Sequence, residues 1–204
     1  CQRVAAIPWG HARWLRADRS FLAGRTATEG LFSAPAFRRT IRDWSDATRF
    51  DVAFVFCSSM VQYLNVPGLA DVPTVVDLVD VDSQKWLDYA AHARGPKRYL
   101  LRLEGRRLRR LEASLPERVD AVTLVSPQEV ELFQSFCPSD RVFAIRNGVD
   151  LEYFRPQKSG GRGQGSAVSG QSSVDSPSPP PSALRPPISA LVVFVGALDY
   201  EANL

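Results

Sequence analysis

The chain has 204 residues, of which 45% are hydrophobic and 23% are charged, a composition typical of a globular protein with a core. Its 25 Lys and Arg residues exceed its 22 Asp and Glu residues by only three, so bulk charge does not argue for nucleic-acid binding. Residues 188–198, the longest apolar run, are about half as long as a bilayer span requires, which argues against an integral membrane protein.

Short apolar runs alternate with longer amphipathic stretches, and this alternation predicts βαβ units with a parallel sheet. Val, Ile and Phe dominate several of the apolar runs with little polar alternation, which is typical of strands covered on both faces. We expect strands at Arg3–Ile7, Asp51–Cys57, Thr74–Val79, Ala121–Val125 and Val142–Ile145. We expect helices at Ala12–Ala23, Ala34–Thr48, Ser58–Leu64, Ser83–Leu115 with a break at Arg94-Gly95-Pro96, and Pro127–Phe136.

Composition changes sharply at residues 157–189, where 20 of the 33 residues are Ser, Gly or Pro. Such a segment buries too little apolar surface to order itself and is predicted to be a disordered linker. An apolar run ending in Gly196 follows it. We therefore expect an α/β domain at 1–156, the linker at 157–189, and the first strand of a second domain within 190–204.

The ends of the chain suggest a fragment of a longer protein. It begins with Cys1 inside a predicted strand and stops at Leu204, where a new strand–loop–helix unit begins. Cys1, Cys57 and Cys137 are far apart and form no CxxC pair, which argues against a zinc site or a disulfide framework. We expect a reducing, cytoplasmic compartment, because nothing at the start of the chain resembles a secretion signal.

Asp77, Asp80 and Asp82 lie at or just after a predicted strand, and we expect them on one side of the sheet if the strand extends that far. Asp80 and Asp82 are candidates for binding hydroxyl groups or for acting as a base. Asp82 or Ser83 is equally a candidate cap for the following helix. A magnesium site is disfavoured, because no partner His, Asn or Glu is evident nearby.

Ser126-Pro127-Gln128-Glu129 predicts a helix start, with Ser126 as N-cap, Pro127 at the first position and Glu129 three residues after the cap. Because it directly follows a predicted strand, Ser126 is placed at the carboxyl edge of the sheet, where open α/β sheets bind ligands. Asn147-Gly148 after a buried strand indicates a tight turn, and Gly196 at a strand end could approach a phosphate; each signal is weak alone.

The predicted helix at 98–110 is rich in arginine and has two interpretations. One is a solvated face, with Leu101, Leu108, Leu111 and Leu115 as the buried stripe. The other is attraction to an anionic membrane surface or to a phosphate-bearing substrate. Nucleic acid is disfavoured, because no aromatic residues are interleaved with the arginines.

Five blocks in this order resemble one bacterial family: VDLVDVDSQKW, LEGRRLRRLE, TLVSPQE, RNGVDLEYFRP and VFVGALDYEAN. The family is the glycosyltransferases of group 1 (family 4), especially the sugar transferases of exosortase-linked exopolysaccharide clusters. The resemblance covers about residues 1–154 and 193–204. The VDVDSQKW block and the NGVD block with its following Phe and Pro are its more specific parts.

The resemblance implies a GT-B fold, in which two Rossmann-like domains face a cleft. The second domain would hold a nucleotide-sugar donor, and the sugar would pass with retention of configuration and without a metal to a lipid-linked or polysaccharide acceptor at the first domain. On the acceptor side, Asp80 and Asp82 would face the cleft, and Ser126 and Glu129 would open its last helix. Asn147 and Gly148 would lie at the crossover, and Gly196 would begin the loop near the donor diphosphate.

The given sequence departs from the family pattern in three ways. It lacks the expected first strand with its Gly-containing loop, and it lacks most of the donor domain with its paired glutamates. It also contains a long Ser/Pro/Gly insert that is unusual for the family. We therefore expect the fragment alone to be inactive, and we assign no catalytic residue and no cofactor. The alternative hypothesis is a non-catalytic α/β module that uses the same acidic residues to bind saccharide.

Overall fold

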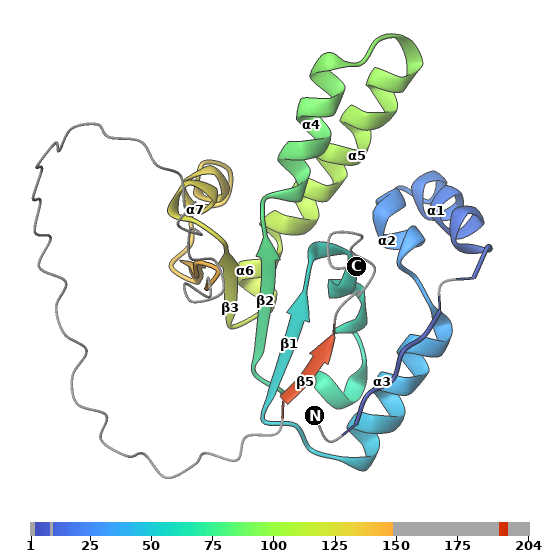
Figure 1. Cartoon of the computed structure of the whole chain (residues 1–204), viewed down its shortest axis with the longest axis vertical. Coiled ribbons are helices and arrows are strands. Elements are labelled where there is room, and N and C mark those ends of the chain that lie inside the picture. Colours follow the sequence, from blue (N-terminus) through green and yellow to red (C-terminus); the bar gives the residue numbers. More distant parts are fainter. Residues whose placement is uncertain (1–2, 9, 149–191, 196–204) are drawn as a thin grey trace, which may run out of the picture. The chain divides into compact units, whose positions relative to one another are not determined.

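The computed structural model describes residues 3–8, 10–148 and 192–195. Its centre is a parallel sheet of five strands in the order β4-β3-β2-β1-β5 (Figure 1). The strands are β1 (Val52–Phe56), β2 (Thr74–Val79), β3 (Ala121–Leu124), β4 (Val142–Ala144) and β5 (Val192–Val195). The predicted α/β class with a Rossmann-like parallel sheet is therefore confirmed.

Each predicted helical stretch contains a helix, and the stretch at 58–64 is a 3-10 helix, η1. The short helices α2, η2 and α6 are not predicted from the sequence. The described helices are α1 (Arg13–Leu22), α2 (Ala27–Leu31), α3 (Pro35–Ala47), η1 (Ser58–Tyr63), η2 (Pro67–Leu69), α4 (Asp82–His92), α5 (Gly95–Ala113), α6 (Leu115–Arg118) and α7 (Pro127–Gln134). The predicted break is confirmed, because α4 ends at His92 and Gly95 takes a left-handed φ of 62° before α5 continues. None of these helices combines the length and the apolar character that crossing a membrane would require.

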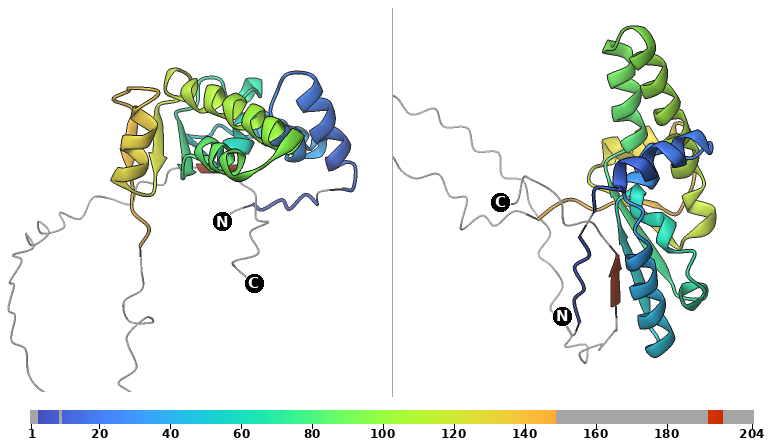
Figure 2. Two further views of the ribbon diagram at one scale, coloured as in Figure 1. Left: turned by 90° about the horizontal axis from the view of Figure 1, so that it is seen from above. Right: turned by 90° about the vertical axis from the view of Figure 1, so that its right-hand side faces the viewer.

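The α4–α5 pair forms a helical hairpin that extends beyond the carboxyl ends of the strands (Figures 1 and 2). The two helices pack closely because Gly105 carries no side chain: a Cβ there would lie 3.0 Å from Leu87 Cδ2. Leu108 on the same helix is completely buried.

The core lies on one side of the sheet. Ala53, Val55, Val76 and Val122 are completely buried there, whereas Phe194, whose ring stacks on the half-buried Phe54, is 54% exposed on the other. The expectation that strands are covered on both faces is therefore wrong for the described part of the chain.

The strand predicted at Arg3–Ile7 is wrong. Residues 3–8 form no ladder, and Val4 is 75% exposed. The free edge of β1 pairs instead with β5, from Val52 opposite Val192 to Val55 opposite Val195. A run of four apolar β-formers competes better for that edge than a segment interrupted by Ala5 and Ala6 and closed by Pro8.

β5 was expected to begin a second domain, but it lies in this sheet. Among the described residues, β5 belongs to the same compact unit as residues 3–8 and 10–146. The predicted linker at 157–189 and the remainder of the predicted second domain lie outside the described residues, so the domain boundaries stay predictions.

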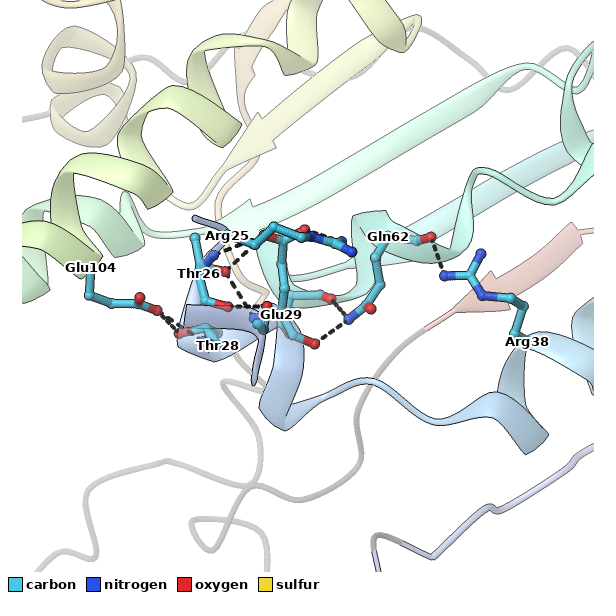
Figure 3. Close-up of polar contacts among 9 residues, drawn as sticks. Arg25, Thr26, Thr28, Glu29, Arg38, Gln62 and Glu104 are labelled. Carbon is cyan, nitrogen blue, oxygen red and sulfur yellow. Dashed lines mark hydrogen bonds and ion pairs between the residues drawn. The ribbon is translucent and has the colours of Figure 1, made fainter. Parts of the chain in front are cut away.

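Glu104 of α5 holds the start of α2 (Figure 3). Its buried carboxylate accepts hydrogen bonds from Ala27 N at 2.8 Å, Thr28 N at 2.9 Å and Thr28 Oγ1 at 2.8 Å. Thr26 and Glu29 complete a capping box at the same helix. A carboxylate at a helix N-terminus satisfies amides that have no partner within the helix and also interacts favourably with the helix dipole.

Candidate functional site

The structure brings together the four acceptor-side residues that the sequence singled out. Asp80 and Asp82 follow β2, and Ser126 and Glu129 follow β3, the adjacent parallel strand. The contact that joins the two groups is between Glu129 Oε2 and the backbone N–H of Val81, at 2.7 Å. The site therefore lies at the carboxyl edge of the sheet, where parallel α/β folds bind their ligands.

The turn after β2 sets the direction of the two aspartates. Val79 has a φ of 66°, which is strained for a β-branched residue, and Asp80 N donates to Leu78 O at 2.8 Å. Asp77 accepts from Val79 N at 3.2 Å and from Thr123 Oγ1 at 3.0 Å. The expectation that Asp77, Asp80 and Asp82 share one side of the sheet is therefore wrong, because β2 ends at Val79 and Asp77 is bound to Thr123 of β3. Asp77 and Asp80 are also three positions apart, which would place them on opposite faces of a continuous strand.

Asp80 and Asp82 share one cation. Lys85 Nζ lies 3.0 Å from Asp80 Oδ2 and 3.4 Å from Asp82 Oδ1. Partial burial favours the neutral amine, but the two carboxylates outweigh it and raise the pKa of Lys85. Lys85 therefore remains charged and holds both carboxylates at the edge.

The carboxylates of Asp80 and Asp82 remain partly exposed to solvent, so a ligand can contact them. Their side chains are 37% and 28% exposed, and within the described part of the chain Lys85 is the side chain that contacts the Asp80 carboxylate. Asp82 also accepts from Ser58 Oγ at 2.7 Å. Partly exposed carboxylates in fixed positions are suited to accept hydrogen bonds from sugar hydroxyl groups.

Ser126 and Glu129 fix the start of α7 and connect it to the turn after β2. Ser126 Oγ accepts from Glu129 N at 3.2 Å, which confirms the predicted N-cap. The Glu129 carboxylate binds Val81 N, outside its own helix, and so ties α7 to the turn that carries Asp80 and Asp82.

The cap of α4 comes from Glu112 on α5, a residue that sequence reasoning missed. The N-cap position is Val81, and neither Asp82 nor Ser83 caps the helix with its side chain. Ser83 N donates to Glu112 Oε1 at 2.9 Å, and Ser83 Oγ donates to Glu112 Oε2. One signal could have identified Glu112: it continues the buried stripe of α5 four residues after Leu108.

Glu112 is completely buried, and this burial changes the pKa of its carboxyl group. Desolvation raises its pKa from 4.5 to about 7, and hydrogen bonds from Ser83 and the nearby Arg109 charge oppose this only in part. Arg109 donates to Ser83 Oγ at 3.2 Å and to Gln84 Oε1 at 2.6 Å, and its guanidinium stacks 4.4 Å from the Phe136 ring.

The other predicted positions are not joined to this edge. Asn147 and Gly148 are exposed residues after β4, and Gly196 lies outside the described residues. Across 3–8, 10–148 and 192–195, no group of three or more His, Cys, Asp or Glu side chains could hold a metal ion.

Replacing Glu112 with Gln should flatten the dependence of stability on pH. Because the folded pKa is raised, the contribution of Glu112 is fully present below pH 4.5 and is lost as pH rises through about 7. We expect the wild-type free energy of unfolding to fall by about 3 kcal/mol more than that of Glu112→Gln over this range. Urea unfolding at several pH values measures it. The exposed Glu131→Gln is the control, and parallel curves for wild type and Glu112→Gln would contradict the assignment.

Comparison with known proteins identifies the family to which the chain belongs. A family profile described as "Glycosyl transferase 4-like domain" matches residues 2–148. No curated protein and no solved structure gives a significant match. The profile covers most of the chain and every element from α1 to β4. The chain therefore belongs to the glycosyl transferase 4-like domain family.

Proposed function

We propose that the chain is the acceptor-side domain of a GT-B glycosyltransferase. The enzyme would move a hexose from a nucleotide-sugar donor, with retention and without a metal, to a lipid-linked or polysaccharide acceptor in exopolysaccharide or cell-envelope synthesis. The single observation that carries this proposal is the pair of partly exposed carboxylates, Asp80 and Asp82, fixed at the carboxyl edge of the sheet. The family assignment supports glycosyl transfer in general.

The residues of the edge would act mainly by positioning. Asp80 and Asp82 would accept hydrogen bonds from acceptor hydroxyl groups, while Lys85, Ser58 and Glu129 keep their turn in place. Holding donor and acceptor in the correct geometry lowers the activation barrier of transfer, because a bimolecular step becomes effectively unimolecular. A second Rossmann-like domain would hold the donor, with Asn147 and Gly148 at the crossover and Gly196 near the diphosphate.

Replacing Asp80 or Asp82 with Asn should weaken acceptor use. Each change removes a charged hydrogen-bond acceptor worth about 1.5–3 kcal/mol, so we expect kcat/KM for the acceptor to fall by about 10- to 100-fold. The measurement is transfer of labelled sugar from nucleotide sugars to lipid-linked acceptors, using the longest product of the gene that encodes this chain.

The matched control is Asp140→Asn, an exposed aspartate in the loop before β4. It should leave transfer unchanged. Equal transfer by Asp80→Asn, Asp82→Asn and wild type would remove the two aspartates from the site. Saccharide binding without transfer from any nucleotide sugar would favour the non-catalytic binding module instead.

We also propose a cytoplasmic enzyme that contacts the anionic inner face of the membrane peripherally, through the arginine-rich α5. The arginines of this helix are of two kinds. Arg107 donates to Phe21 O at 2.6 Å, and Arg109 binds Ser83 and Gln84, so both serve the fold. Arg98, Arg102 and Arg106 are exposed. Tyr99 and Leu100, 69% and 50% exposed, lie between the first two and add apolar surface.

Replacing Arg98 and Arg102 together with Gln should weaken binding to anionic vesicles. Each basic residue near such a surface contributes about 1 kcal/mol, so we expect about 30-fold weaker partitioning. Flotation with vesicles of phosphatidylcholine and phosphatidylglycerol measures it, and the control is Arg49→Gln with Arg118→Gln, two exposed arginines elsewhere. Equal flotation of both variants would contradict membrane contact through α5.

A further inference from the structure

A basic hollow lies at the start of α3, apart from the residues discussed above. It has a volume of about 380 Å³ and is lined by Ser33, Ala34, Pro35, Arg38, Arg39 and Arg42. The volume falls within the range of small-molecule sites, about 300–1,000 Å³. Arg42 lies four positions after Arg38 and three after Arg39, so its side chain neighbours both of the others on the surface of α3.

Arg38 is held in place before any ligand arrives. Its guanidinium donates to Gln62 O at 3.0 Å and lies 5.3 Å from the centre of the Tyr63 ring. The Gln62 amide is in turn bound to Glu29 O and Ser59 O, both at 2.8 Å (Figure 3). Arg38 therefore lies against two buried residues, Gln62 and Tyr63, whose side chains already have hydrogen-bond partners.

Arg39 and Arg42 remain available to a ligand. Both are exposed, and within the described residues neither guanidinium has a hydrogen-bond or ion-pair partner. The start of the helix contributes little itself: Ala34 N already donates to Tyr63 Oη at 2.7 Å, and Pro35 has no N–H. Three guanidinium groups around one hollow favour an oxyanion that can accept several charged hydrogen bonds at once.

The hollow lies at the same edge of the sheet as Asp80 and Asp82. Arg38 and Ala34 contact Gln62 and Tyr63 of η1, which directly follows β1, so the start of α3 lies near the carboxyl end of that strand. In Figure 1 α3 runs from this edge toward the opposite one, antiparallel to β1.

We propose that this hollow binds the phosphate or diphosphate group of the lipid-linked acceptor. The inference rests on the proposed function, since it assigns the acceptor's phosphate to Arg38, Arg39 and Arg42 and its sugar hydroxyl groups to Asp80 and Asp82. Arginine is suited to this role because its planar fork binds phosphate oxygens in pairs. One edge of the sheet would then recognise both chemical parts of the acceptor.

The test compares Arg39→Gln/Arg42→Gln with Arg49→Gln/Arg118→Gln, which removes the same charge from exposed positions outside the hollow. Calorimetry measures binding of inorganic pyrophosphate to the 204-residue chain. A second arm uses polyprenyl diphosphate in phosphatidylcholine vesicles, with phosphatidylglycerol vesicles of equal charge for comparison. Circular dichroism checks that each variant is folded.

We expect wild type to bind pyrophosphate and to release it when polyprenyl diphosphate vesicles, but not phosphatidylglycerol vesicles, are added. Arg39→Gln/Arg42→Gln should bind both diphosphates about 30-fold more weakly or worse, and the control within about twofold of wild type. Equal binding by the hollow variant, or an equal loss in the control, would overturn the proposal. Pyrophosphate that the lipid fails to displace would overturn the lipid assignment.

These outcomes separate this inference from the proposed function. Transfer to a lipid-linked acceptor that survives Arg39→Gln/Arg42→Gln unchanged would overturn the hollow as acceptor site while glycosyl transfer stands. Absence of any transfer by the gene product would overturn the proposed function. Loss of pyrophosphate binding in the hollow variant alone would still identify a phosphate site.

Discussion

Two buried carboxylates of α5 hold the N-termini of two other helices, and the carboxyl edge of the sheet depends on them. Glu104 accepts from the first amides of α2, and Glu112 accepts from Ser83 at the start of α4. Both acids lie on the buried face of α5, on either side of Leu108. A helix end buried without such a partner would leave several amides unsatisfied, at a cost of about 1–3 kcal/mol each. The helix that carries the exposed arginines is thus also the one that fixes the loops around the site.

The parallel topology explains why functional groups from distant parts of the sequence meet. Neighbouring strands β2 and β3 end at one edge, and the Glu129 contact with Val81 locks their following segments together. The segment after β1 supplies Ser58 to Asp82 and also supports Arg38 at the basic hollow. Acidic and basic groups are therefore separated along one edge. That separation suits an acceptor with sugar hydroxyl groups at one end and a phosphate at the other.

Local patterns predicted most elements, because their causes are local. Thr74–Val79 is a strand with the predicted bounds, Ser126 caps α7, and the Gly95-Pro96 pair divides the long helix. What the sequence could not predict depends on tertiary contacts. Arg3–Ile7 resembles a strand in composition, but pairing depends on which segment occupies the edge of β1. Glu112 as the cap of α4 required knowing which helix crosses the start of another, since Ser83 and its partner are 29 positions apart.

Amide hydrogen exchange at the starts of α2 and α4 tests the central claim most directly, because amides without a partner in their own helix exchange quickly unless another group binds them. If the α5 carboxylates bind them, Ala27, Thr28 and Ser83 exchange as slowly as the interior of α5. Glu104→Ala should then release only the first two, and Glu112→Ala only the third. Exchange of all three in the wild type at the rate of an unstructured peptide would contradict the account.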